Sequence, residues 1–227
     1  MYINIYCKYI ILLNCFILWS NSAFGQDAFS SHLDKSDLFI NPANTNIPLI
    51  NNVKAKAFLS YRDQWNALSP DASYRTAFAE GDFNMYKSAV DAWNLSFIFM
   101  NDRADKGNLQ QNMIQFSTAY TRRLSGDKIN LRKSLFMSAG IAIAINQVGT
   151  NFENLWFGRQ FDTNLLAVDL TIPSGENFIY DNISFVNLNL GMRWIYIDQN
   201  FNQFSTGISL NNINSPNISL REEVVSL

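Results

Sequence analysis

The residue types that most often perform catalysis are scarce in this 227-residue chain. His32 is the only histidine, and it stands in a polar stretch (SSHLDKSD) where we interpret it as a linker residue. Cys7 and Cys15, the two cysteines, both fall in an apolar N-terminal segment. Zinc sites need several His or Cys ligands, and Ser-His-Asp or Cys-His catalysis needs a positioned histidine. The sequence therefore predicts neither a zinc site nor nucleophilic catalysis of these kinds.

Carboxylates are the other candidate catalytic groups, because a pair of them can catalyse the hydrolysis of a glycosidic bond. Here they fall in segments that we expect to be turns and loops, where aspartate is favoured for local hydrogen bonding. The stretch Asn101–Gly107 (NDRADKG) loosely resembles a calcium loop but lacks the remaining ligands. We expect a protein that is not an enzyme and that uses no cofactor or metal. The carboxylates considered are Asp102, Asp105, Asp162, Asp169 and Asp181.

Two short motifs remain near the N-terminal end. One is LFINPA at Leu38–Ala43 and the other is YRDQW at Tyr61–Trp65. An Asn-Pro pair is typical of a turn, and the second motif is interpreted as a strand that ends in an aromatic residue at a membrane interface. A structural role and a partner-contacting role both stay open for the candidate site residues, which are Asn41, Pro42, Ala43, Tyr61, Arg62, Gln64 and Trp65.

The elements that must position these motifs are predicted to be strands. In Phe185–Tyr196 (FVNLNLGMRWIY) apolar residues alternate with small or polar ones, which places the two kinds on opposite faces of a strand. The apolar face ends in Trp194 and Tyr196, and the run is about as long as a bilayer-crossing strand, roughly 9–11 residues. Apolar residues outside, polar residues inside and aromatic residues at the end are typical of a membrane barrel.

Six further segments repeat this alternation. It is clear in Leu135–Asn146, Trp93–Asn101 and Asn112–Arg122, and weaker in Val53–Tyr61, Ser73–Glu80 and Phe201–Leu210. We predict an all-β fold, an antiparallel transmembrane β-barrel of the outer-membrane type. About seven or eight strands are expected, near the lower limit for a closed barrel, so an incomplete barrel is also expected as an alternative.

The connections between these strands are predicted from their polar residues and turn formers. Short turns are expected at Asn101–Gly107 and Ser125–Lys128. Gly149–Leu165 and Thr171–Asn182 break the alternation and are interpreted as longer loops, the first offering Trp156 and Phe157 as aromatic anchors for a partner. We interpret several basic residues as a solvated turn, namely Arg122, Arg123, Lys128, Arg132 and Lys133.

Composition and the N-terminus indicate where the protein works. With 16% charged residues, a mean hydropathy of −0.07 and a formal net charge of −2, the chain is typical neither of a disordered protein nor of a nucleic-acid-binding one. Lys8 is the only charge before Asp27, Tyr9–Ser20 is apolar, and Ala23 and Gly25 are small. We predict a secretory signal peptide at residues 1–25 and a barrel domain at residues 26–227.

In their order, the motifs resemble the PorP/SprF family of type IX secretion membrane proteins. The resemblance covers Gln26 to Asn217 and rests on four stretches: FINPANTN at Phe39–Asn46, YRDQW at Tyr61–Trp65, LSFIFMNDRADKG at Leu95–Gly107 and FSTGISLNNINSPN at Phe204–Asn217. Thr45, Asn46 and Asn211-Asn212 depart from the family pattern. Family chains usually continue well past Asn217, so the resemblance leads us to expect a shortened member.

The resemblance implies a protein of the outer membrane of a Gram-negative bacterium, working in type IX secretion and often alongside gliding motility. Expected partners are a secreted cargo or adhesin with a type IX C-terminal domain, other components of the secretion machinery, and outer-membrane lipid. No catalysis and no nucleic acid are implied. Two other functions stay open from the residues alone: a small pore or solute-binding barrel, and a soluble secreted β-sandwich.

Overall fold

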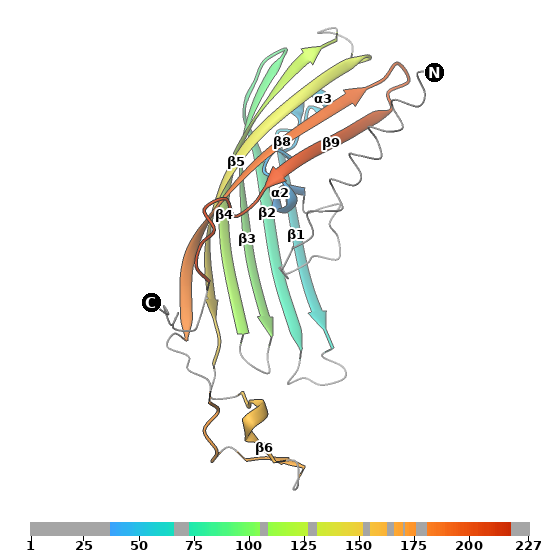
Figure 1. Ribbon diagram of the computed structural model, residues 1–227. Helices are drawn as coiled ribbons and strands as arrows, with labels where there is room; N and C mark the ends of the chain where they lie inside the picture. Colours follow the sequence, from blue (N-terminus) through green and yellow to red (C-terminus); the bar gives the residue numbers. More distant parts are fainter. Residues whose placement is uncertain are drawn as a thin grey trace, which may run out of the picture.

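The computed structural model describes residues 37–65, 73–104, 109–126, 131–151, 155–162, 166–169, 171–175 and 181–218. Most of this part of the chain forms one seven-stranded antiparallel sheet with the order β1-β2-β3-β4-β5-β8-β9 (Figure 1). Its strands are β1 (Ala55–Gln64), β2 (Tyr74–Lys87), β3 (Asp91–Ala104), β4 (Leu109–Ser125), β5 (Ser134–Gly149), β8 (Asn182–Ile197) and β9 (Gln203–Leu210).

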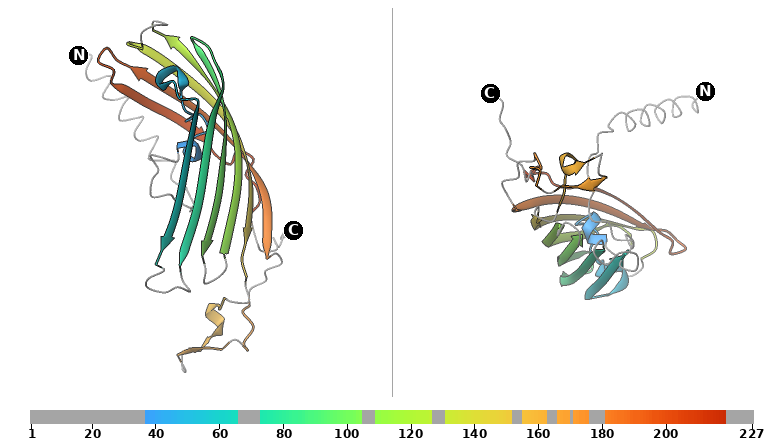
Figure 2. Two further views of the ribbon diagram at one scale, coloured as in Figure 1. Left: turned by 180° about the vertical axis from the view of Figure 1, so that it is seen from behind. Right: turned by 90° about the horizontal axis from the view of Figure 1, so that it is seen from below.

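The sheet is strongly curved and encloses a concave side, so that it has the shape of half a barrel (Figure 2). Each strand pairs with its sequence neighbour in the sheet, and β1 and β9 are its two edges. The prediction of an all-β antiparallel fold of the outer-membrane barrel type is confirmed. Among the described helices, none is long and apolar enough to cross a membrane.

The convex face of the sheet is apolar and exposed. Residues paired across neighbouring strands point to the same side, so the registers align the convex side chains in rows. One such row joins Leu59, Ala79, Phe99, Ile114, Ile145 and Val186, and another joins Tyr86, Trp93, Tyr120, Ala139, Met192 and Ile208. The predicted alternation with apolar residues outside is therefore confirmed in Phe185–Tyr196, Leu135–Asn146, Trp93–Asn101 and Asn112–Arg122. In Ser73–Glu80 it is wrong, because Phe78 is buried on the concave side and the convex residues are Arg75, Ala77 and Ala79.

The concave face is covered by the chain that precedes β1. We call residues 37–54 the inner segment. It contains α2 (Asp37–Ile40), a turn at residues 42–43 and α3 (Pro48–Asn51), and both short helices lie on the concave side (Figures 1 and 2). Leu38 packs in a cluster with Phe78, Ile98 and Met100 of the sheet. Ile47 and Leu49 pack at the other end with Ala92, Phe136, Ile195 and Ile197.

A small unit interrupts the sheet between β5 and β8. It contains the 3-10 helix η4 (Gly158–Gln160) and the two-residue strands β6 (Phe161–Asp162) and β7 (Ala167–Val168), and it lies beyond the strand ends (Figure 1). The loop prediction is confirmed at residues 171–175, whereas the predicted loop Gly149–Leu165 contains η4 and β6. Trp156 stacks on Phe161 with ring centroids 6.2 Å apart, and Trp156 is 53% exposed.

Some predicted details are wrong. Asn101–Ala104 is not a turn, because β3 continues through it and Asp102 accepts a bond from the Thr76 hydroxyl. Arg123 is not solvated: it lies on the concave face of β4, is 8% exposed, and its guanidinium stands 5.1 Å from the centre of the Phe136 ring. The helices α2, α3 and η4 were not expected either, being too short to show a helical period. The signal peptide, His32, Asp105 and Lys128 lie outside the described residues.

Candidate site: the inner segment on the concave face

The end of the LFINPA motif, residues 41–43, forms a tight turn, as predicted for its Asn-Pro pair, and Leu38–Ile40 belong to α2. The Asn44 amide N–H donates to the Asn41 carbonyl at 2.9 Å, and the Ala43 amide N–H donates to the Asn41 side-chain oxygen at 2.8 Å. Pro42 suits the position after Asn41 because its ring fixes φ near the value that such a turn needs. Local sequence therefore sets the shape of this turn, and Ala43 at its centre is fully buried.

The Asn41 side chain ties this turn to the far edge of the sheet. Its amide nitrogen donates to the carbonyl oxygens of Met192 on β8, at 3.1 Å, and Ile208 on β9, at 3.2 Å. Asn41 is only 4% exposed, and the bond from the Ala43 amide is buried, whereas the bonds to Met192 and Ile208 are partly buried. A backbone carbonyl without a partner is costly in such a place. One asparagine thus shapes the turn with its oxygen and holds two strands with its nitrogen.

Two glycines make room for the turn. A Cβ on Gly140 of β5 would come within 2.5 Å of the Pro42 carbonyl oxygen. A Cβ on Gly191 of β8 would overlap the Asn41 side-chain oxygen. The backbone of the inner segment therefore lies directly on the backbone of β5 and β8, an approach that only glycine permits.

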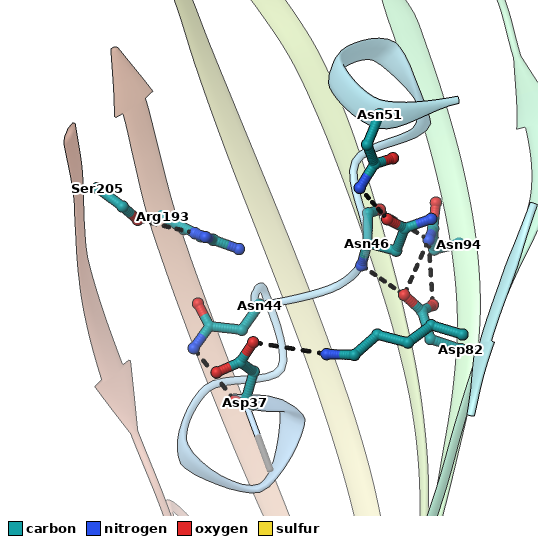
Figure 3. A network of polar contacts seen from close by, with 9 residues as sticks. Asp37, Asn44, Asn46, Asn51, Asp82, Asn94, Arg193 and Ser205 are labelled. Atoms are coloured by element: carbon teal, nitrogen blue, oxygen red, sulfur yellow. Dashed lines mark hydrogen bonds and ion pairs between the residues drawn. The ribbon is translucent and has the colours of Figure 1, made fainter. Parts of the chain in front are cut away.

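A buried carboxylate holds the next part of the inner segment. Asp82 of β2 is 1% exposed and accepts bonds from the Asn46 amide N–H and from the Asn94 side chain at 3.0 Å (Figure 3). It also accepts a bond from the Ser96 hydroxyl at 2.8 Å. The Asn94 side chain also donates to the Asn46 carbonyl at 2.9 Å. Both backbone groups of Asn46 are thus bound by strands β2 and β3.

Charged residues approach the inner segment from two sides, one from strand β1 and the other from strand β8 (Figure 3). Lys56 of β1 lies 3.6 Å from Asp37, and the Asn44 side chain donates to the Asp37 carbonyl at 3.1 Å. Arg193 of β8 donates to the Ser205 hydroxyl of β9 at 2.9 Å and extends toward the same region. These groups border a cavity of about 260 Å³ between the inner segment and the sheet.

The YRDQW motif is not part of this site, because it lies at the end of β1 that points away from α3 (Figure 1). Arg62 and Gln64 face the concave side and Tyr61 faces the convex side, whereas Trp65, which follows the strand with a φ of 64°, is exposed at the strand end. Trp65 meets Tyr74 edge to face, with ring centroids 5.5 Å apart. The structure thus joins Asn41, Pro42 and Ala43 in one turn and leaves the second motif at the sheet end.

Comparison with known proteins gives one match. A protein-family model, described as type IX secretion system membrane protein PorP/SprF, matches residues 22–226. The chain belongs to the PorP/SprF family. No curated protein and no solved structure matches this chain. The resemblance seen in the motifs is thereby confirmed, and with it the assignment to a type IX secretion membrane component.

The sequence analysis of this PorP/SprF protein did not identify the sheet residues that contact the inner segment. Asp82 lies beyond the predicted strand segment Ser73–Glu80, whereas in the structure β2 continues through it to Lys87. Gly140 and Gly191 were recognised merely as members of the small or polar face. Their significance comes from the inner segment that contacts them, which lies far away in sequence.

Chemically, the site of this family member can bind and hold a peptide backbone. Its polar groups are mostly amides, hydroxyls and backbone carbonyls, and they are engaged with one another. Within the residues that the structure describes, no group of three or more His, Cys, Asp or Glu side chains is placed to hold a metal ion. The arrangement suits a structural docking role for the LFINPA turn.

Proposed function

We propose that this PorP/SprF protein is a non-enzymatic barrel component of the type IX secretion machinery in the outer membrane of a Gram-negative bacterium. It aids the export or surface anchoring of a partner adhesin or secreted protein with a type IX C-terminal domain. The family match over residues 22–226 carries this proposal. The match supports a role in type IX secretion, and the geometry of the sheet supports its placement and orientation in a membrane.

The dimensions of the convex face support placement in a bilayer. On β3, Asp91 and Asn101 bound a run of convex residues consisting of Trp93, Leu95, Phe97 and Phe99. At roughly 3.3 Å per residue this run spans about 33 Å along the strand. At the tilt usual for outer-membrane strands it covers about 25 Å, the height of an outer-membrane apolar band.

The connection lengths support one orientation. Residues 65–73, 105–108 and 150–181 connect strands at one end of the sheet, and residues 88–90, 126–133 and 198–202 connect them at the other. Outer-membrane barrels have short periplasmic turns and longer extracellular loops. The end that carries residues 150–181 therefore faces outward in this proposal, and α3 lies toward the periplasmic end.

In this orientation the unit between β5 and β8 offers an aromatic surface outside the cell. Trp156 and Phe161 are stacked and exposed there. Exposed aromatic residues are common anchors at protein interfaces because they bury a large area with few rotatable bonds. We therefore assign partner contact to this pair, and assign a structural role to Asn41, Pro42 and Ala43.

The two other candidate functions have less support. The inner segment fills much of the described concave side, which is unfavourable for an open pore. In a β-sandwich a second sheet would cover the apolar face, whereas here the convex apolar residues of the described sheet are exposed. Neither observation favours a second proposal.

Deletion of the gene tests the proposed function. We expect surface display of one particular type IX cargo to be lost while display of the other cargoes continues, as measured by surface labelling and mass spectrometry. Unchanged display of every cargo would contradict the proposal. Complementation with Trp156→Ala and Phe161→Ala together tests the aromatic pair, and Leu166→Ala is the matched control because it is an exposed apolar residue of the same unit.

A further inference from the structure

An apolar groove lies on the convex face of the sheet. It has a volume of about 670 Å³ and lies across β2, β3, β4 and β5 near the end with the short turns. Its lining is almost entirely apolar, and it consists of Tyr86, Trp93, Thr118, Tyr120, Ala139, Gly140 and Ile141. We propose that this groove binds one phospholipid molecule, with an acyl chain along the groove and the headgroup at Arg122 and Asp91.

The groove arises from one small residue in a row of large ones. Tyr120 pairs with Ala139, which pairs with Met192, so a methyl group stands between two long side chains. Next to it, Gly140 has no side chain, and its concave side is occupied by Pro42. The floor of the groove is therefore backbone and a methyl group, and its walls are aromatic rings.

One wall of the groove is held in place. The Trp93 indole N–H donates to the Thr118 hydroxyl at 2.6 Å, and that hydroxyl donates to the Asn94 carbonyl at 3.1 Å. The indole therefore keeps its orientation, and the groove exists before any ligand enters. A preformed groove loses less conformational entropy on binding than one that the ligand must open.

Charged groups mark the headgroup end. Arg122 follows Tyr120 by two residues along the convex face, toward the membrane surface, and its side chain is 62% exposed. Asp91 lies 3.8 Å from the Arg122 Nε, and its side chain is 21% exposed. A guanidinium suits a phosphate, and a carboxylate suits an ammonium. The guanidinium and the carboxylate together complement a zwitterionic headgroup such as ethanolamine phosphate. A phospholipid is therefore the occupant that fits both the apolar groove and its charged end.

The test is photolabelling of the full-length protein in vesicles of phosphatidylglycerol, which lacks the ammonium group, into which phosphatidylethanolamine with a diazirine in its acyl chain is titrated. We expect labelling to concentrate on residues 118–120 and 139–141. It should saturate there at a lower fraction of labelled lipid than in the row that contains Phe116 and Ile143. Even labelling of all convex rows, saturating together, would indicate ordinary boundary lipid and overturn the proposal.

Variants add a second readout. Ala139→Trp fills the groove and should reduce labelling of residues 118–120 several-fold, whereas Ala79→Trp, on the same face but outside the groove, should not. Arg122→Gln should weaken retention of the lipid in detergent roughly tenfold, the loss expected for one charge-assisted hydrogen bond. Each variant must keep the heat-dependent gel mobility of the parent. A folded Ala139→Trp protein with undiminished labelling would overturn the proposal independently of the saturation measurement.

Discussion

At the scale of single residues, Asn41 makes the largest number of connections in the inner segment. Its side-chain oxygen closes the turn through the Ala43 amide, and its nitrogen binds carbonyls of β8 and β9. These partners belong to three separate parts of the chain, so the Asn41 side chain connects the turn to strands β8 and β9. No other residue type has an acceptor and a two-hydrogen donor at this short reach.

The replacement Asn41→Ala should therefore destabilise the protein by about 2 kcal/mol, because it leaves buried donors and acceptors without partners. The measurement is urea unfolding followed by gel mobility. Asn200→Ala is the matched control, since Asn200 is an exposed turn residue of which only the backbone N–H bonds to Asp198. Equal midpoints for the two variants would show that the Asn41 bonds contribute little.

At the scale of elements, the hairpin between β8 and β9 depends on one carboxylate outside the strands. Asp198 accepts bonds from the Asn202 side chain, from the Asn202 amide N–H and from the Asn200 amide N–H. The bond from the Asn202 side chain contributes most to lowering the pKa of Asp198 below its ordinary value, and the two backbone N–H bonds add to it.

This lowered pKa predicts the pH dependence of the turn. A group with a depressed folded-state pKa stabilises the fold above its unfolded pKa, about 3.9 for aspartate, and the stabilisation is lost as the pH falls through the folded-state pKa. We expect hydrogen-exchange protection of residues 199–203 to fall as the pH drops through this acidic range. Asp198→Asn should reduce the protection at neutral pH and abolish its pH dependence. A variant that titrates like the parent would assign the effect to another group.

The strands were predictable from the sequence, and the inner segment was not. Alternation is a local property, so Phe185–Tyr196 shows its two faces without any knowledge of its neighbours. The Asn-Pro turn is equally local. By contrast, the contacts of Asn41 with Met192 and Ile208 span 151 and 167 residues, and no local pattern encodes them. The turn's shape was therefore accessible from sequence, and its location on β5 and β8 was not.

At the scale of the whole molecule, the convex face should respond to charge according to depth. Ile143 lies in the middle of the apolar band on β5, and Gln147 lies on the same strand and face at its polar border. Ile143→Arg should cost about 2–4 kcal/mol and Gln147→Arg about 0–1 kcal/mol, the values expected at the midplane and near the interface of a bilayer. The comparison uses unfolding from lipid vesicles, and equal costs would mean that this face does not contact lipid.

The docking of the inner segment also has a consequence for the order of assembly. The segment comes first along the described chain, yet its anchors include β9, the last described strand. It cannot reach its final position until nearly the whole sheet has been made and paired. Contacts of such long sequence separation form late and slow the folding of a chain. We therefore expect the bond between Asn41 and Ile208 to form late in folding, after β9 has paired with β8.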